Sequence, residues 1–237
     1  MNQRHLTILT GASRGMGLAM AQQLLAAGHD LVCISRKTND DLAARARAAG
    51  RALEQWPQDL ARPETAAARL ETWLQSQDAA ALASVTLINN AGLIPRIAPV
   101  DDIPAAQLAE AMRVDLEAPM LLTAAFLRAT AAVQAPRKVL NISSGLGRRA
   151  MAAQAAYCAA KAGMDHFTRC VALEQAALAN GAKVCSLAPG VIDTDMQAQL
   201  RGSSVAGFPE RKMFVELKET GRLSSSHEAA ARVLAWL

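Results

Sequence analysis

Short runs of consecutive apolar residues, many of them β-branched, recur along the chain, and alanine- and leucine-rich stretches separate them. Such runs are typical of strands that are buried on both faces of a parallel sheet, whereas the stretches between them favour helices. The runs cover residues 5–10, 30–35, 52–56, 85–88, 138–142 and 183–187. Repeated alternation of strand and helix implies right-handed crossovers, and therefore predicts an α/β fold with a Rossmann-type, doubly wound parallel sheet in three layers.

The stretches between the strands predict helices over residues 39–49, 63–77, 105–133 and 152–179, besides one that begins in the first glycine-rich loop. We find no internal repeat, linker or low-complexity tract, so residues 1–237 are expected to form one domain. The segment between Met196 and Met213 carries Gly202, Gly207 and two serines, and we expect it to act as a lid over a substrate.

Composition narrows the class of function. The chain is 51% hydrophobic with a net charge of +4, and it lacks the basic stripe with interleaved aromatic residues that is typical of nucleic-acid binding. The four cysteines make neither a CxxC pair nor a zinc-ligand spacing, and the histidines have no cluster of acids or thiols around them, so no metal site is predicted. Without a signal peptide or a membrane-length apolar run, we expect a reduced, cytoplasmic protein.

A glycine-rich loop follows the first strand directly and leads into a helix. Glycine permits the tight turn and close backbone approach that a pyrophosphate needs, and the helix N-terminus offers free N–H groups. The spacing is GxxxGxG, which differs from the general GxGxxG fingerprint, and by itself it also suits a turn that binds nothing. Its context between strand and helix favours nucleotide binding by Gly11, Ser13, Arg14, Gly15, Met16 and Gly17.

Three further candidate ligand-binding segments follow directly after predicted strands. Asn89-Asn90-Ala91-Gly92 follows the fourth strand, Ser143-Ser144 the fifth and Pro189-Gly190 the sixth. Ligands of open parallel sheets bind beyond the carboxyl ends of the strands. We therefore expect these residues to meet the glycine-rich loop at one edge of the sheet.

Tyr157 and Lys161 are four residues apart in an alanine-rich helix, which places both side chains on one helix face. A phenol titrates near pH 10, and a lysine ammonium one turn away is expected to lower that pKa, which would make the tyrosine a general acid or base. The alternative is an ordinary surface pair, and the motif alone does not distinguish the two.

Taken together, the loop from Gly11 to Gly17, the Asn-Asn-Ala-Gly run, Ser144, Tyr157-x-x-x-Lys161 and Pro189-Gly190 resemble the short-chain dehydrogenase/reductase family in order and spacing. The runs from Tyr157 to Ala162, from Val171 to Glu174 and from Ala188 to Gln197 narrow the resemblance to its sepiapterin reductase and benzil reductase-like branch. The family implies hydride transfer between a nicotinamide cofactor and a carbonyl or alcohol, and members of this branch use NADPH.

The resemblance also implies roles for individual residues. Tyr157 would protonate the carbonyl oxygen, Lys161 would lower the Tyr157 pKa and hold the nicotinamide ribose, and Ser144, chosen over Ser143 from the spacing to Tyr157, would donate to the same oxygen. The remaining cofactor contacts are expected from Asp59, Leu60, Asn90, Ala91, Gly92, Pro189, Gly190, Ile192 and Thr194.

Two features depart from the family pattern. Val114 is followed by Asp115, where many members have an asparagine that supports a proton-relay water; an aspartate can hold water but adds charge. The family usually has a seventh strand after its last helix, and we expect that strand to be missing here, together with the tail that carries the pterin-binding carboxylate of sepiapterin reductases.

The end of the second strand bears on the choice of cofactor. An NAD enzyme of this fold usually has an acid there for the ribose 2′-OH, but this chain reads Ser35-Arg36-Lys37, and Arg14 lies in the adjacent loop. Two arginines suit a 2′-phosphate, because a guanidinium pairs two oxygens at once, and this predicts NADP(H). The alternative is that both are solvated surface charges.

The sequence therefore predicts a homodimeric, NADPH-dependent reductase of a small carbonyl compound, such as an aromatic ketone, a diketone or a sepiapterin-like molecule. The alternatives are a ketoreductase or alcohol dehydrogenase of another substrate class, and a dinucleotide-binding regulatory protein without catalysis. We expect Arg148-Arg149 to be a solvated loop or, less simply, to attract an anionic substrate.

Overall fold

The computed structural model describes residues 3–204 and 207–237. Its strands are β1 (Arg4–Thr10), β2 (His29–Ser35), β3 (Leu53–Pro57), β4 (Leu82–Asn89), β5 (Arg137–Ile142) and β6 (Lys183–Leu187). Its helices are α1 (Gly15–Ala26), α2 (Asp40–Ala48), α3 (Pro63–Gln75), α4 (Ala105–Met112), α5 (Ala118–Ala129), α6 (Ala155–Ala176), α7 (Asp195–Arg201), α8 (Arg211–Glu219) and α9 (Ser226–Leu234).

The strands form one parallel sheet in the order β3-β2-β1-β4-β5-β6. The order reverses next to β1, since the chain first moves outward through β2 and β3 and then crosses back to β4. Crevices at such a reversal are the usual ligand sites of doubly wound sheets. The six-stranded, doubly wound sheet predicted from the sequence is confirmed.

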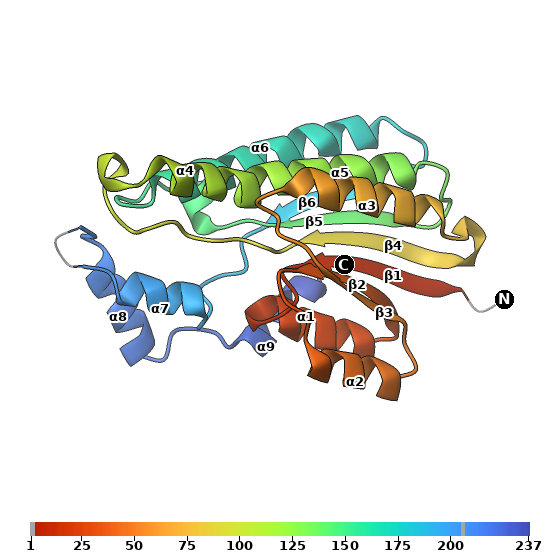
Figure 1. The fold of residues 1–237 in the computed structure, drawn as a ribbon, viewed down its shortest axis with the longest axis horizontal. Coiled ribbons are helices and arrows are strands. Elements are labelled where there is room, and N and C mark those ends of the chain that lie inside the picture. The colour runs from red at the N-terminus through yellow and green to blue at the C-terminus, as the bar shows by residue number, and fades with distance from the viewer. Residues whose placement is uncertain (1–2, 205–206) are drawn as a thin grey trace.

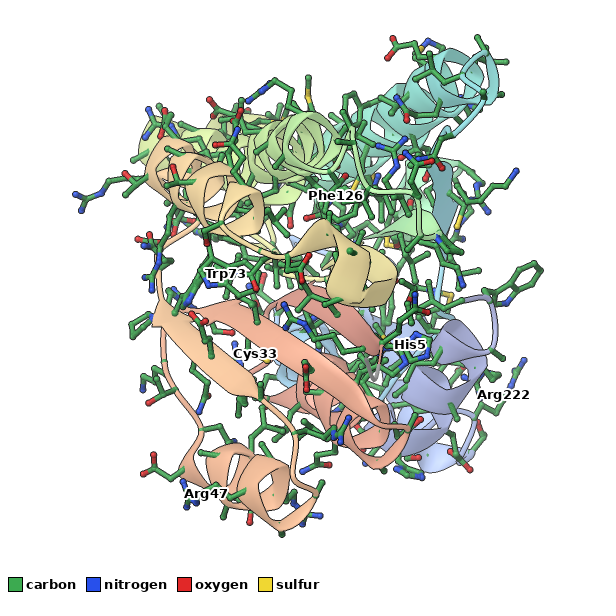
Figure 2. The ribbon with its side chains drawn as sticks, turned by 90° about the vertical axis from the view of Figure 1, so that its right-hand side faces the viewer. His5, Cys33, Arg47, Trp73, Phe126 and Arg222 are labelled. Carbon is green, nitrogen blue, oxygen red and sulfur yellow. The ribbon has the colours of Figure 1, made fainter. Side chains whose placement is uncertain are left out.

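Helices cover both faces of the sheet. Figure 1 shows α3, α4, α5 and α6 on one side, and α1, α2 and α9 on the other, with α7 and α8 set apart from both layers. Figure 2 shows the same layers after a quarter turn, with Phe126 of α5 above the sheet and Arg47 of α2 below it. This three-layer arrangement leaves the carboxyl ends of the central strands open toward α7 and α8.

The core follows the alternation of side chains along each strand. Ile8, Val32 and Leu87 pack with Phe126 in the layer beneath α3 and α5, whereas Leu9 and Leu31 pack on the opposite face against Met20 and other residues of α1. Because both faces are covered, nearly every residue of β1 and β2 is buried, which explains their continuous apolar runs.

Two predicted helices differ from the observed ones. The helix expected over residues 105–133 is divided by a π-helical turn at Arg113–Glu117 and ends at Ala129. The helix expected over residues 152–179 is shorter, because a loop extends to Gln154 and contains Ala153 in the left-handed region at φ 60°. Both differences lie at or near predicted site residues, because the π-helical turn contains Asp115 and the loop ends shortly before Tyr157.

The predicted lid, Met196 to Met213, covers α7 from its second residue, the following segment and the start of α8, apart from residues 205–206, which lie outside the described residues. Asp193, in the segment between β6 and α7, pairs its carboxylate with Arg201 of α7 at 3.5 Å and with Lys218 of α8. Gln199 donates to the Ile94 and Pro95 carbonyls, both at 3.2 Å. The lid is therefore attached on two sides of the opening, and its movement stays a prediction.

The expected homodimer also stays a prediction. The outer surfaces of α5 and α6 carry apolar side chains, since Met120 is 39% exposed and Leu173 is 75% exposed. Within residues 3–204 and 207–237, no helix is long and apolar enough to cross a membrane.

Candidate active site

A cavity of about 1230 Å³ opens at the carboxyl ends of β1, β2, β4 and β5. Its border includes every residue that the sequence predicted as a cofactor contact, and also Ser144, Tyr157 and Lys161. Segments that are separated in the sequence by more than a hundred residues therefore meet at one site. Asp115 is the exception among the predicted site residues.

The glycine-rich loop is held by hydrogen bonds to the end of β2. Gly11, at φ 71°, donates its N–H to the Ile34 carbonyl at 2.8 Å, and the Ala12 N–H donates to Ser35 Oγ at 2.9 Å. Gly17 is so close to the start of the loop that a Cβ on it would lie 2.1 Å from the Gly11 oxygen. The loop therefore takes a single compact shape with the N-terminus of α1 facing the cavity.

Asn90 lines the cavity and also holds the glycine-rich loop in place. Its side-chain amide donates to the Thr10 carbonyl at 3.0 Å and to the Gly11 carbonyl at 3.3 Å. In return, the hydroxyl of Thr10 accepts from the backbone N–H groups of Asn90 and Ala91, both at 2.9 Å. The β4 end and the β1 end are thereby fixed to each other beneath the cofactor side of the cavity.

Tyr157 and Lys161 lie on the first turns of α6 and face the cavity, although both are nearly buried. The Lys161 ammonium lies 5.6 Å from the centre of the Tyr157 ring and donates to the Ile142 carbonyl at 3.2 Å. Ser143 and Ser144 both border the cavity, but it is Ser144 whose hydroxyl lies close enough to the Tyr157 phenol to lower its pKa, while the Ser143 hydroxyl has no partner among the described residues. This favours the choice of Ser144 over Ser143.

The sequence predicted that Lys161 lowers the pKa of Tyr157, and this prediction is wrong for the structure. Burial raises the pKa of the phenol, the charge of Asp115 raises it further, and the hydrogen bond with Ser144 only partly offsets them. Lys161 does not reverse this, because its ammonium is directed at the Ile142 carbonyl and lies near a carboxylate of its own. Tyr157 is therefore protonated at neutral pH, which is the form that a proton donor requires.

Asp115 does not border the cavity, so its predicted catalytic role, the support of a proton-relay water, would be indirect and stays a prediction. It is fully buried in the π-helical turn, behind Gly92, whose Cβ would lie 2.9 Å from Asp115 Oδ1. That oxygen accepts from the Leu93 N–H at 3.0 Å and lies 3.9 Å from the Lys161 ammonium. Asp115 can therefore act on the site only through Lys161 and through its charge.

The end of the cavity near β2 is cationic. Arg36 and Lys37 are exposed on its border, and no acid follows β2 before the helix α2. Asp41 lies on α2, where it pairs with Arg45 at 2.8 Å. Arg14 borders the cavity but forms an ion pair with Asp195 across the opening, a contact that the sequence did not suggest. The glycine loop and this cationic rim fit the pyrophosphate and ribose phosphate of a dinucleotide.

The other end of the cavity is apolar, and its residues were mostly missed by sequence reasoning. Ile94, Met151, Leu200 and Phe214 form a cluster with Tyr157 on one side of the opening. They come from the loop after β4, the loop before α6 and the helices α7 and α8, so no common motif connects them. The lid composition between Met196 and Met213 was the only signal that pointed to this wall.

Two charged residues on the border, Glu110 of α4 and Arg149, were also not assigned to the site from the sequence. Arg148, next to Arg149, pairs with the buried Asp165 at 3.3 Å. Across the described ranges, we find no group of three or more histidine, cysteine or acidic residues that could hold a metal. The site therefore combines a glycine-rich loop at a helix N-terminus, a buried tyrosine beside a lysine, and an apolar compartment.

A Rossmann-type sheet with these groups at one cavity defines a dinucleotide-dependent oxidoreductase. The family model for short chain dehydrogenases matches residues 5–204, and the chain belongs to this family. It is 36% identical over 232 residues to a benzil reductase ((S)-benzoin forming) of Bacillus subtilis, covering 98% of this chain and 93% of the relative. A sepiapterin reductase of Xenopus laevis is 29% identical, with 97% and 89% covered.

Solved structures show the same relation. A putative 2-deoxy-D-gluconate 3-dehydrogenase from Agrobacterium tumefaciens with bound NADP superimposes with a TM-score of 0.78 at 31% identity, covering 98% of this chain and 87% of that one. The fold and the family resemblance expected from the motifs are therefore confirmed.

Proposed function

We propose that this chain catalyses the NADPH-dependent reduction of a small aromatic ketone or diketone to an alcohol, with Tyr157 as the proton donor. The observation that carries the proposal is the convergence of Ser144, Tyr157 and Lys161 between a dinucleotide cradle and an apolar compartment in one cavity. A carbonyl group placed there has its oxygen beside the two hydroxyl groups and its substituents against the apolar wall.

The cofactor, when bound, supplies the hydride to the carbonyl carbon, and the residues of the chain control the oxygen. The Ser144 hydroxyl holds the carbonyl oxygen next to the Tyr157 phenol, and the phenol gives its proton to that oxygen as negative charge develops there. The buried Lys161 ammonium stabilises the phenolate that results. The surrounding apolar side chains exclude water, which strengthens each of these interactions.

The substrate class is supported by the wall of the cavity. Ile94, Met151 and Phe214 offer aliphatic and aromatic surface, which suits an aryl group better than a sugar or a charged acyl carrier. The benzil reductases that resemble this chain act on an aromatic diketone by name, and they match nearly its full length.

The deciding experiment measures NADPH consumption by the purified chain with benzil, with aliphatic ketones and with a 3-oxoacyl substrate. We expect the highest kcat/KM for benzil. Turnover confined to the aliphatic or acyl substrates would instead support a ketoreductase or alcohol dehydrogenase of another class. NADPH binding without turnover of any of them would support the regulatory alternative.

Replacement of Arg36 by alanine tests the cofactor. If Arg36 contacts the 2′-phosphate, we expect the Kd for NADPH to rise roughly 10- to 100-fold, the usual worth of a hydrogen bond to a charged group, with little change for NADH. Arg14→Ala should have a smaller effect, because the Arg14 guanidinium is already paired with Asp195. Fluorescence titration with both cofactors gives the comparison.

Arg45→Ala is the matched control for this test, since Arg45 is also exposed but lies on α2 and pairs with Asp41. Equal affinity of the unmodified protein for NADPH and NADH would contradict the assignment of Arg36, whatever the variants do.

A further inference from the structure

Asp115 is a buried carboxylate for which the reaction above has no direct use. Its side chain is fully buried, and Oδ1 has one hydrogen bond, from the Leu93 N–H at 3.0 Å. Oδ2 is buried without a partner among the described residues. A carboxylate in such a place costs stability unless a nearby cation offsets its charge. It sits in a π-helical turn, a distortion that occurs frequently at functional sites.

The nearby cation is Lys161, which lies close to both Asp115 and Tyr157. Its ammonium is 3.9 Å from Asp115 Oδ1 and 5.6 Å from the centre of the Tyr157 ring, and the exposed fractions of the three side chains are all small. Burial lowers the pKa of Lys161, and the charges of Asp115 and Asp165 oppose that effect. With Lys161 protonated and Asp115 ionised, the buried group of three is neutral while Tyr157 keeps its proton. Loss of that proton would leave one uncompensated negative charge in a site of low polarity, which is unfavourable.

We propose that Asp115 is a positioning residue whose negative charge keeps Tyr157 in the protonated, proton-donating form into the alkaline range. The proposal rests on the proposed function for the role of Tyr157, but it concerns the electrostatic control of that residue. An asparagine at residue 115 would leave the same group with a net positive charge, and the phenolate would then be favoured. In this chain the negative charge of the Asp115 carboxylate therefore offsets the positive charge of Lys161.

The other titratable and charged groups around the three residues do not replace Asp115. Asp165, one turn further along α6, pairs with Arg148 Nε at 3.3 Å, and its charge raises the pKa of Lys161 less than that of Asp115 does. Cys158 lies beside Tyr157 and adds to the increase of its pKa, but less than burial and Asp115 do. The acidic Glu110 and the basic Arg149 also border the cavity. Neither makes a hydrogen bond or ion pair to Tyr157 or Lys161 among the described contacts. Burial raises the pKa of Asp115 itself to about 6, so the carboxylate is mainly ionised above that pH.

The composition of the chain permits a direct test, because Tyr157 is its only tyrosine. The near-ultraviolet absorbance of tyrosinate therefore reports the protonation of this single residue without cofactor or substrate. We expect Asp115→Asn to lower the pH of the tyrosinate transition by about 1–2 pH units, the effect of one charge at this range in a partly buried site. Circular dichroism at each pH identifies the range in which the variant remains folded.

Asp165→Asn is the matched control, since it also removes a buried carboxylate that acts on Lys161, but one that pairs with Arg148 and is not among the groups that shift the pKa of Tyr157. Its tyrosinate transition should move much less. Asparagine can keep the hydrogen bond from the Leu93 N–H, and Asp115→Ser provides a second neutral variant that still offers an oxygen acceptor. Tyr157→Phe must abolish the transition and so verifies the signal.

The pH dependence of kcat/KM for ketone reduction is the second measurement. Reduction requires protonated Tyr157, so its decline at alkaline pH should begin at lower pH in Asp115→Asn than in the unmodified protein. If folded neutral variants at residue 115 show the tyrosinate transition at the same pH as the unmodified protein, or if Asp165→Asn shifts it equally, the proposal is overturned. Absence of any reductase activity, by contrast, would count against the proposed function and leave the spectroscopic result intact.

Discussion

Replacement of Tyr157 by phenylalanine is expected to lower kcat for carbonyl reduction by about 10²–10⁴-fold, the usual contribution of a positioned general acid. The phenylalanine ring keeps the packing of Tyr157 against the apolar wall but has no proton to give. The Kd for NADPH should stay within about threefold of its original value, because the cradle formed by the glycine loop and Asn90 is unchanged. Steady-state kinetics and cofactor titration on the same preparation provide both numbers.

Ser144→Ala serves as the comparison for this variant. It removes a hydrogen bond to the carbonyl oxygen and to the phenol but leaves the acid in place, so its kcat should fall less than that of Tyr157→Phe. Turnover of Tyr157→Phe close to that of the unmodified protein would show that another group supplies the proton. In that case Tyr157, Ser144 and Lys161 would have a structural role and no catalytic one.

The sequence was most informative where local chemistry determines local structure. Runs such as that ending at Thr10 could be recognised as strands because both sheet faces are covered. The glycine-rich segment from Gly11 could be recognised as the turn between a strand and a helix because it stands between the two patterns. The carboxyl ends of parallel strands then brought Ser144 and Asn90 to the same edge of the sheet. These inferences required only the order of the elements along the chain.

The sequence was least informative where the result depends on burial in three dimensions. The spacing of Tyr157 and Lys161 indicated a shared helix face, but it could not show that Lys161 is directed at the Ile142 carbonyl and Asp115 rather than at the phenol alone. For the same reason the direction of the Tyr157 pKa was predicted wrongly. The apolar wall was missed because Ile94 and Phe214 belong to segments that share no pattern and meet only in the folded chain.

Gly17→Ala is expected to have the second large effect, this time on cofactor binding. A Cβ at residue 17 would lie 2.1 Å from the Gly11 oxygen and 2.5 Å from Asn90 Nδ2, closer than van der Waals contact permits. The first atom belongs to the backbone and the second to a side chain held by two carbonyls, so neither can move away without breaking the loop. Overpacking of this kind typically costs about 1–3 kcal/mol. We therefore expect a lower melting temperature and a Kd for NADPH increased by at least about tenfold.

Gly145→Ala is the matched control for this variant, because Gly145 also borders the cavity but has open space around it. It should retain both the melting temperature and the NADPH affinity of the unmodified protein. The comparison separates the cost of one added methyl group at the cavity border from the cost of forcing α1 away from the end of β1. Unchanged NADPH affinity in Gly17→Ala would mean that the glycine-rich loop does not hold the cofactor, since the methyl group cannot be accommodated while the observed contact between Gly17 and Gly11 is kept.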